Sequence, residues 1–401
     1  MQGGTERLTF PGGNGAVLAG RLERPFGALR AVALFAHCFT CTKNSHAATR
    51  IASHLAGLGI ATLRFDFTGL GGSDGDFAMT GFSANVADIV AAADFLRDRL
   101  AAPAILIGHS LGGAAVIAAA HDIPEAKAVV TIGAPFDAAH VLSALGDLSQ
   151  IEREGRGMIN IAGRHFPVTK AFLDDARQQK QADFLAHLDK ALLILHAPRD
   201  EYVDIDNARQ IFAAARHPKS FITLDDANHL LTDPADAAYA AALIAAWVSH
   251  YLPPPTRDTG VPQGTVVVET AGGAFTQTVT AGPHRFLADE PVDKGGDDRG
   301  PSPTDSILTA LGCCTAMTMQ FYARRETLPL EAVRVTMTLS QESARETPDT
   351  KPILKTTLRR RIVIKGDLDE AQHQDLIRVA EKCPIHKLLT GRIVIETEEE
   401  R

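Results

Sequence analysis

The chain has 401 residues, of which 45% are hydrophobic and 22% charged, so it has a globular composition and exceeds the length that one core usually organises. A net charge of -8 provides no basic stripe for a phosphate backbone, which excludes nucleic acid as a partner. The length therefore predicts more than one domain. No signal sequence stands at the start and no apolar run reaches roughly 18 residues, so we expect a cytoplasmic protein without a membrane partner.

From residue 30 to residue 251, short aliphatic runs alternate with longer amphipathic stretches, which is the pattern of strands and crossover helices in a parallel sheet. The strands predicted for this sheet are Ala31–Ala36, Ala61–Phe65, Ala104–Ile107, Ala128–Ile132, Ala191–Leu195 and Ser220–Leu224. Helices are predicted over Ser83–Leu100 and Ala235–Tyr251, where apolar residues recur every three or four positions. The expected fold is a mostly parallel, doubly wound α/β sheet.

A predicted hairpin precedes this sheet and a predicted lid interrupts it. The strands Arg7–Phe10 and Val17–Leu22 are joined by a glycine-rich turn. Residues 137–190 are too long, too mixed in charge and too often broken by glycine for one crossover helix, and we interpret them as a small lid over the site. The first domain is predicted to span residues 1–252.

A run of prolines beginning at Pro253 predicts an interdomain linker over residues 253–259, because proline stiffens an extended segment and removes backbone donors. Residues 260–401 then change character, with strands and one buried helix in an order that is not a repeated βαβ pattern. The strands predicted there are Gly264–Thr270, Phe275–Ala281, Val333–Leu339 and Leu358–Ile364. This order predicts a second domain of the α+β class.

The segment Gly108-His-Ser110-Leu-Gly112 follows an apolar strand and precedes a strong helix former. A serine between glycines on a strand-to-helix turn is typical of a nucleophile elbow, where the helix N-terminus faces the developing oxyanion. We therefore predict that Ser110 is a nucleophile. The alternative interpretation is a tight structural turn.

A nucleophilic serine needs a histidine base, and the histidine needs an acid that fixes its tautomer. Asp200 follows one predicted strand and His229 follows the last, so both lie where sites of open α/β sheets form. We predict that Asp200 is the acid and His229 the base. Asp204 is the nearest substitute for Asp200, and a surface loop histidine is the alternative for His229.

Stabilising the oxyanion requires two backbone N–H groups. One is expected from Leu111, after the nucleophile, and the other from Phe39, in the loop after the strand Ala31–Ala36. Cys38 and Cys41 in the same loop have C-x-x-C spacing, but they lack the context of a redox motif. We interpret them as small buried thiols, and we expect all five cysteines to stay reduced.

Residues 5–251 resemble the α/β-hydrolase superfamily. The resemblance rests on the elbow, on His37-Cys-Phe39, and on Asp66-Phe-Thr-Gly-Leu-Gly-Gly-Ser73-Asp after the fourth strand. The family usually has glycine at the position of Cys38. The resemblance implies a serine hydrolase of carboxylic esters that works through an acyl-enzyme without a metal or cofactor; the alternative is a binding domain that has kept its triad.

In the second domain, Ser302-Pro-Thr-Asp305 has the pattern of a capped helix start, which makes Asp305 a capping carboxylate. One apolar face is predicted for this helix, formed by Ile307, Leu311, Cys314, Thr318 and Phe321. Cys314 alone could be a core residue. Cys383, however, precedes Pro384 at a second predicted helix start beside Lys382, which favours thiolate chemistry.

Residues 260–395 resemble the OsmC/Ohr family of hydroperoxide reductases. The matching motifs are Ala288-Asp-Glu-Pro291, Gly295-Gly296, the run from Gly300 through Cys314 to Thr318, and Lys382-Cys-Pro-Ile-His-Lys387. The resemblance implies a peroxidatic Cys314, a resolving Cys383, an external dithiol or lipoylated protein as reductant, and a homodimer.

Some family features are missing or ambiguous in this second domain. The family's Glu helper is represented only by Asp305, and its distant Arg only by the candidate Arg285. Cys313 is interpreted as structural. A zinc site from Cys314, Cys383 and His386 lacks a fourth ligand and is not expected. A dimerising module with inert thiols is the other alternative.

Overall fold

The computed structural model describes residues 4–25, 29–38, 42–76, 80–137, 148–161, 164–254, 259–271, 273–344 and 353–399. The chain divides into two compact units. The first unit comprises Met1–Gly272 with Thr280–Arg285, and the second comprises Gly273–Val279 with Phe286–Arg401. None of the helices in the described ranges is long and apolar enough to cross a membrane.

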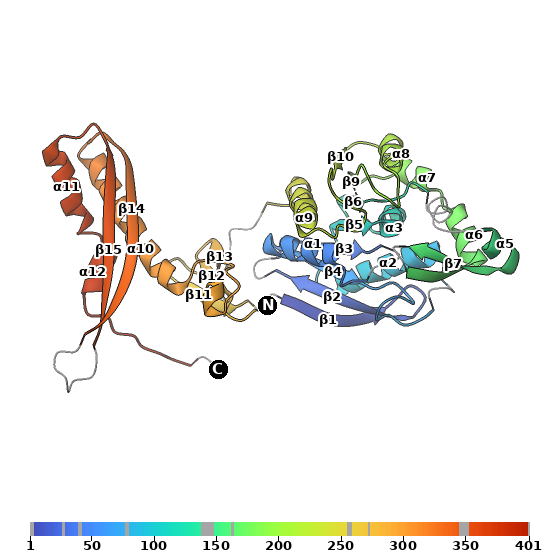
Figure 1. Ribbon diagram of the computed structural model, residues 1–401, viewed down its shortest axis with the longest axis horizontal. Helices are drawn as coiled ribbons and strands as arrows, with labels where there is room; N and C mark the ends of the chain where they lie inside the picture. Colours follow the sequence, from blue (N-terminus) through green and yellow to red (C-terminus); the bar gives the residue numbers. More distant parts are fainter. Residues whose placement is uncertain are drawn as a thin grey trace. The chain divides into compact units, whose positions relative to one another are not determined.

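An 8-stranded sheet organises the first unit (Figure 1). Its strands are β1 (Gly4–Pro11), β2 (Val17–Arg24), β3 (Ala31–Ala36), β4 (Ile60–Phe65), β5 (Ile105–His109), β6 (Ala128–Ile132), β9 (Ala191–His196) and β10 (Lys219–Thr223). They lie in the order β1-β2-β4-β3-β5-β6-β9-β10; the β1–β2 and β2–β4 pairs are antiparallel, and the strands from β4 to β10 pair in parallel. The α/β sheet predicted from the sequence is confirmed.

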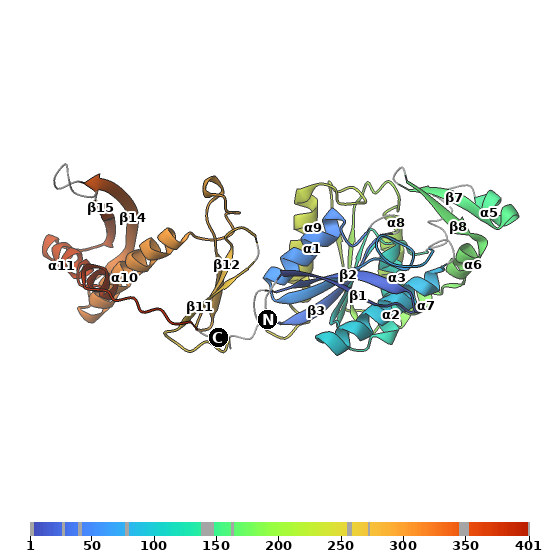
Figure 2. The same ribbon diagram turned by 90° about the horizontal axis from the view of Figure 1, so that it is seen from below.

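Helices cover both faces of this sheet, as Figure 2 shows. On one face lie α1 (His46–Gly57) and α9 (Pro234–Val248). On the other lie α2 (Phe82–Arg99), α3 (Leu111–Ala119) and α8 (Asp206–Ala214). Because side chains alternate along a strand, Leu34 joins the core on one face while Phe35 joins the core on the other. This burial on both faces explains why the central strands are continuous aliphatic runs.

The segment between β6 and β9, where the lid is predicted, has secondary structure of its own. It contains α5 (Leu148–Glu154), the hairpin β7 (Arg156–Ile161) with β8 (Arg164–Thr169), and the helices α6 (Lys170–Gln178) and α7 (Gln181–Ala186). The hairpin was not predicted, because its strands alternate polar and apolar residues too irregularly. Phe172 and Leu173 of α6 are buried in the main core, which anchors this segment to the sheet.

The part of the chain beyond the predicted linker has the α+β order expected from the sequence. It begins with a 3-stranded sheet of β11 (Val266–Thr270), β12 (Gln277–Ala281) and β13 (His284–Ala288). The long helix α10 (Pro303–Arg325) then packs against the hairpin of β14 (Leu330–Ala344) and β15 (Ile353–Gly366). The helices α11 (Glu370–Ala380) and α12 (Pro384–Thr390) complete the fold, and both contact α10.

The apolar face predicted for α10 is only partly correct. The residues that the chain buries are Leu311, Thr315, Met319 and Ala323. Ile307 and Phe321 are instead 49% and 69% exposed. The reason is that the hairpin and α11 cover one side of α10, whereas the predicted stripe runs partly along its uncovered side.

Candidate active site

Ser110 lies on a sharp turn between β5 and α3, with φ 56° and ψ -127°. A positive φ is strained for a residue with a side chain, and such strain is typical of a nucleophile elbow. The turn requires close backbone approach, because a Cβ on Gly108 would lie 2.3 Å from Gly112 O, and one on Gly112 would lie 2.5 Å from Ala36 O. Only glycine fits these two positions, so the motif has a steric explanation.

The structure brings Ser110, His229 and Asp200 together. His229 Nδ1 donates to Asp200 Oδ2 at 2.7 Å, and His229 Nε2 lies 3.0 Å from Ser110 Oγ. The bond to the carboxylate places the proton on Nδ1, so Nε2 is free to accept the hydroxyl proton. Only 5% of His229 is exposed. This is the geometry that a general base and its nucleophile require.

Asp200, and not Asp204, supplies the acid of this arrangement. Asp200 Oδ1 accepts hydrogen bonds from the backbone N–H groups of Tyr202 and Val203, each at 2.9 Å. Burial by itself raises the pKa of Asp200. The hydrogen bonds from His229 and from the two backbone groups outweigh this effect, so the net pKa lies below its usual range. Asp204 is exposed and accepts from Asp206 N within its own turn.

Two buried histidines that the sequence analysis missed hold this arrangement in place. His109 Nε2 donates to His229 O at 2.7 Å, and His196 Nε2 donates to Val203 O at 2.8 Å. His109 therefore connects the elbow to the histidine loop, and His196 supports the turn that holds Asp200. Their position at the carboxyl ends of β5 and β9 was the available signal.

Burial lowers the pKa of both histidines. The pKa of His109 falls to about 3, through burial first and then through the neighbouring His229. Burial also lowers the pKa of His196 and of His37, a third buried histidine, which follows β3. All of them are neutral donors in the folded protein.

The oxyanion donors are only partly described. Leu111 is the first residue of α3 and is buried beside the nucleophile, whereas Phe39 lies outside the described residues. A small cavity adjoins the elbow, lined by His37, Phe67, Leu70, Asn85, Leu111, Gly112 and Ala115.

The expectation that all cysteines are free thiols is wrong for Cys38, which is disulfide-bonded. Its side chain is only 2% exposed, which shields the bond from reductants. Cys41 lies outside the described residues, and Cys313, Cys314 and Cys383 are free.

In the second unit, Cys383 is the N-cap of α12 and is fully buried. Its Sγ accepts a hydrogen bond from His386 N at 3.3 Å, and Thr315 Oγ1 lies 3.9 Å from the same sulfur. Cys314, next to Thr315 on α10, is half-buried, and Cys313 is exposed. Thr315, the residue after Cys314, therefore contacts Cys383.

Arg360 is a partly buried arginine near the thiols that the sequence analysis did not single out. Its Nη1 donates to Thr315 Oγ1 at 2.8 Å and to Ala380 O at 2.9 Å, which connects α10 to the segment before Cys383. Nothing in its sequence context distinguishes Arg360 from the neighbouring arginines of β15, because only the packing of the β14–β15 hairpin against α10 brings it to Thr315. Arg285, the predicted helper, is exposed on β13, and no described residue pairs with it.

Asp305 has the capping role predicted for it. Its carboxylate accepts from Ser302 Oγ at 2.7 Å and from Ser302 N at 3.1 Å, and these hydrogen bonds lower its pKa. Across the parts of the chain that the structure describes, no three His, Cys, Asp or Glu side chains form a group that could hold a metal ion.

Comparisons with known proteins match both parts of the chain. A family model described as serine aminopeptidase, S33 matches residues 27–187, and one described as OsmC-like protein matches residues 295–398. The crystal structure of the esterase domain from a Rhodothermus marinus protein is 42% identical, with a TM-score of 0.52, and the match covers 63% of this chain and 99% of that one.

Curated relatives match more distantly. Mitochondrial palmitoyl-protein thioesterase ABHD10 of Mus musculus is 26% identical over 212 residues, which are 51% of this chain and 70% of the relative. The uncharacterized protein YfhR of Salmonella typhi is 27% identical over 231 residues, which are 56% of this chain and 74% of the relative.

The lowered pKa values of the buried histidines predict that the first unit loses stability in acid. Below pH 6.5 the histidines take up protons in the unfolded chain but not in the folded chain. Their contribution to the free energy of unfolding is therefore fully present above pH 6.5 and is lost as the pH falls towards 3. For His109 the expected loss at pH 5 is about 2 kcal/mol. Denaturant unfolding followed by tryptophan fluorescence reports this unit alone, because Trp247 is the one tryptophan of the chain.

His109→Gln keeps a donor for His229 O and removes the titrating group, so its stability should fall less between pH 7 and pH 5. His54→Gln, a change at an exposed position of α1, is the control and should follow the wild type. Equal pH dependence in all three proteins would contradict the assignment.

Proposed function

We propose, for a chain that belongs to the α/β-hydrolase superfamily in its first unit and to the OsmC-like proteins in its second, that the first unit is a serine esterase. The observation that carries this proposal is the continuous hydrogen-bonded series from Asp200 through His229 to Ser110. The likeness to an esterase domain at 42% identity supports the same chemistry.

The residues suggest a mechanism with an acyl-enzyme intermediate. His229 Nε2 takes the proton of Ser110 Oγ as the oxygen attacks the ester carbonyl, and Asp200 stabilises the imidazolium that forms. The Leu111 N–H, at the start of α3, faces the developing oxyanion. His229 then protonates the leaving alcohol, and a water molecule activated by the same nitrogen releases the acid. The name of the mouse relative is that of a thioesterase, and a thioester would react at this site in the same way with a thiol as leaving group.

For the second unit we propose reduction of organic hydroperoxides by its thiols. The supporting observation is the contact of Cys383 with Thr315, the neighbour of Cys314, together with the position of Cys383 at the start of α12. The Cys314 thiolate attacks the distal peroxide oxygen, the O–O bond breaks, and the alcohol leaves after taking up a proton. Cys383 then attacks the sulfenic acid and releases water, and an external dithiol or lipoylated protein reduces the disulfide.

Arg360 would order this thiol site through Thr315. Because the guanidinium donates to Thr315 Oγ1 and Ala380 O at once, it keeps α10 and the end of α11 in fixed relation. The proposed attack of one thiol on the other requires such a fixed relation.

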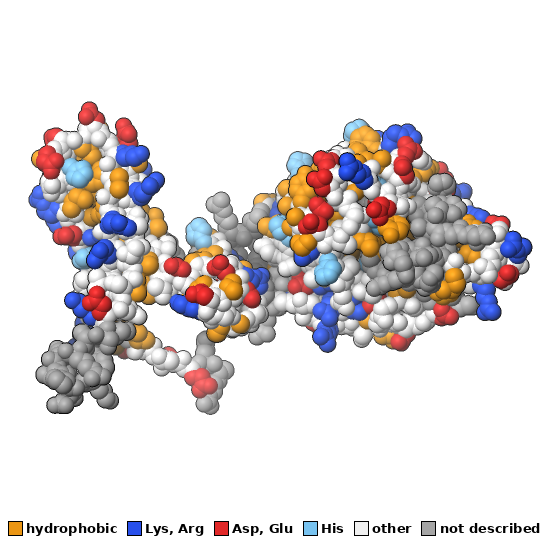
Figure 3. All heavy atoms as spheres, in the orientation of Figure 1, with side chains coloured by type: hydrophobic (Ala, Val, Ile, Leu, Met, Phe, Trp, Pro, Cys, Tyr) orange, Lys and Arg blue, Asp and Glu red, His pale blue; other side chains and the backbone are white. Residues whose placement is uncertain are grey.

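We further propose that the chain forms a homodimer through its second unit. Exposed apolar side chains lie among charged ones on the surface of this unit, as Figure 3 shows. The most exposed on α10 are Met317 at 64% and Phe321 at 69%. A single chain rarely leaves so much apolar surface in water, and a second copy offers an equally apolar face to cover it.

Replacing triad residues tests the esterase. Ser110→Ala should abolish both hydrolysis of p-nitrophenyl butyrate and covalent labelling by a fluorophosphonate, because both need the nucleophile. Asp200→Asn should lower kcat about 10⁴-fold, since the amide no longer fixes the His229 tautomer. Asp204→Asn is the matched control and should keep the wild-type kcat. A wild-type chain that neither labels nor hydrolyses the ester would indicate a binding domain instead.

Replacing the thiols tests the peroxidase. Cys314→Ser should abolish consumption of tert-butyl hydroperoxide in the presence of a dithiol, whereas Cys313→Ser should behave as wild type because that thiol is exposed on another face of α10. Cys383→Ser should accumulate a sulfenic acid at Cys314 that dimedone traps. Undiminished consumption by Cys314→Ser would indicate a dimerising module with inert thiols.

Charging the apolar face tests the dimer. Light scattering should give the wild type twice the mass of one chain, and Met317→Glu with Phe321→Glu should give one chain mass, because burying two carboxylates at the interface is unfavourable. Leu58→Glu, at an exposed apolar position of the first unit, is the control and should leave the mass unchanged. A monomeric wild type would contradict the proposal.

A further inference from the structure

We propose that Asp66 is a positioning residue for ester hydrolysis: its buried carboxylate holds the described ends of the β3–α1 loop (residues 37–38 and 42–45) in place beside the nucleophile elbow. The inference rests on the proposed esterase function. It assigns to Asp66 an effect on the transition state that is separate from its contribution to folding.

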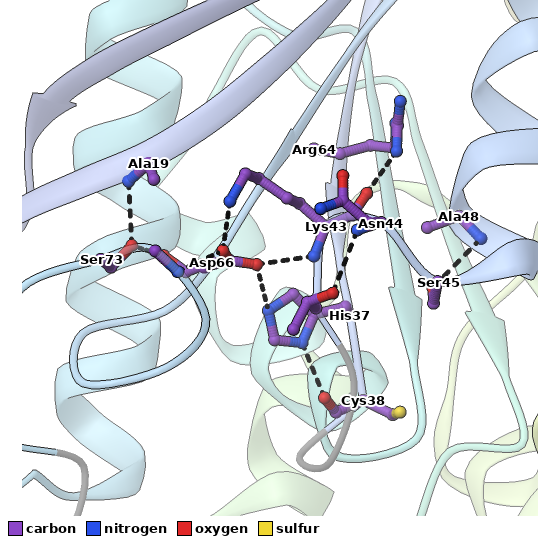
Figure 4. Close-up of polar contacts among 12 residues, drawn as sticks. Ala19, His37, Cys38, Lys43, Asn44, Ser45, Ala48, Arg64, Asp66 and Ser73 are labelled. Atoms are coloured by element: carbon purple, nitrogen blue, oxygen red, sulfur yellow. Dashed lines mark hydrogen bonds and ion pairs between the residues drawn. The ribbon is translucent and has the colours of Figure 1, made fainter.

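Asp66 follows β4 and is fully buried. Its Oδ1 accepts from Lys43 N at 2.6 Å, and its Oδ2 accepts from Gly72 N at 2.8 Å and from the Lys43 ammonium (Figure 4). A buried carboxylate without partners would be very unfavourable, and here donors from two loops satisfy it. The carboxylate therefore fixes the end of the β3–α1 loop to the loop after β4.

His37 holds the beginning of the same loop. Its Nδ1 donates to Cys38 O at 2.7 Å, and its Nε2 faces Asp66 Oδ1 at 3.7 Å. Burial lowers the pKa of His37, so the ring is neutral and fills space between the carboxylate and the Cys38 backbone. Asp66 thus contacts both sides of the segment in which the sequence analysis places the second oxyanion donor, Phe39.

The beginning of this loop is pressed against the elbow. A Cβ on Gly112 would lie 2.5 Å from Ala36 O and 2.6 Å from His37 O, so the two backbones are in direct contact. Gly112 is adjacent to Leu111, whose N–H is the first predicted oxyanion donor. A displacement of His37 would consequently shift the elbow and the Leu111 N–H that the transition state requires.

Asp88 provides a matched comparison, because it is a second buried aspartate with a similar number of partners. It lies on α2 and accepts from Gly13 N at 3.1 Å, Thr68 N at 2.9 Å and Thr68 Oγ1 at 2.8 Å. None of these partners belongs to the β3–α1 loop. Loss of either carboxylate should weaken the fold, but only loss of Asp66 should disturb the contact between the β3–α1 loop and the elbow.

The experiment compares Asp66→Asn with Asp88→Asn in the full-length chain. For each protein it measures kcat and KM for p-nitrophenyl butyrate, the rate of fluorophosphonate labelling, and Tm. We expect Asp66→Asn to lose about 100-fold in kcat and in labelling rate at an unchanged KM, as when one oxyanion donor is lost. Asp88→Asn should lower Tm by a similar amount and keep its kcat.

Lys43→Gln is a milder variant in case Asp66→Asn does not fold. It removes the ammonium and keeps the backbone N–H, so kcat should fall less than in Asp66→Asn while KM stays constant. Equal kcat losses in Asp66→Asn and Asp88→Asn, or a change confined to KM, would overturn the positioning role alone. A wild-type chain without esterase activity would overturn the proposed function and this inference with it.

Discussion

The close contact between the nucleophile elbow and the end of β3 is the constraint on which the first unit depends. Ser110 keeps a backbone conformation that is unfavourable for a side chain, and it can do so because β5, β3 and α3 meet around it without room for another atom. The carbonyl oxygens of Ala36 and His37 lie where a Cβ on Gly112 would stand.

Buried polar groups then extend the constraint outward from the elbow. His109 connects it to the histidine loop, His196 supports the turn around Asp200, and Asp66 connects the β3–α1 loop to the loop after β4. Arg64, also buried, lies between Glu23 and Thr49 and joins β4 to β2 and α1. Each group is unfavourable to bury alone, so each tolerates few arrangements other than the observed one.

The second unit follows a different principle, because the described hairpin and helices pack against one side of its long helix. The hairpin of β14 and β15 and the helix α11 bury Met319 and Ala323, while Met317 and Phe321 remain in contact with water. This exposed surface is the basis of the proposed homodimer, in which an equivalent surface on a second chain would cover it. Cys314 lies in the middle of α10 and Cys383 at the start of α12, and this half-core holds the two helices together.

The sequence by itself determined the elements and the order of the fold, because aliphatic runs, amphipathic periods and glycine spacing are local patterns. It also placed Ser110, Asp200 and His229 at the ends of strands, where parallel sheets form their sites. The hairpin of β7 and β8, the buried stripe of α10, and the roles of His109, Asp66 and Arg360 came only from tertiary structure. A hydrogen bond between residues distant in sequence leaves no periodic pattern in either segment, and whether a helix face is buried depends on which elements pack against it.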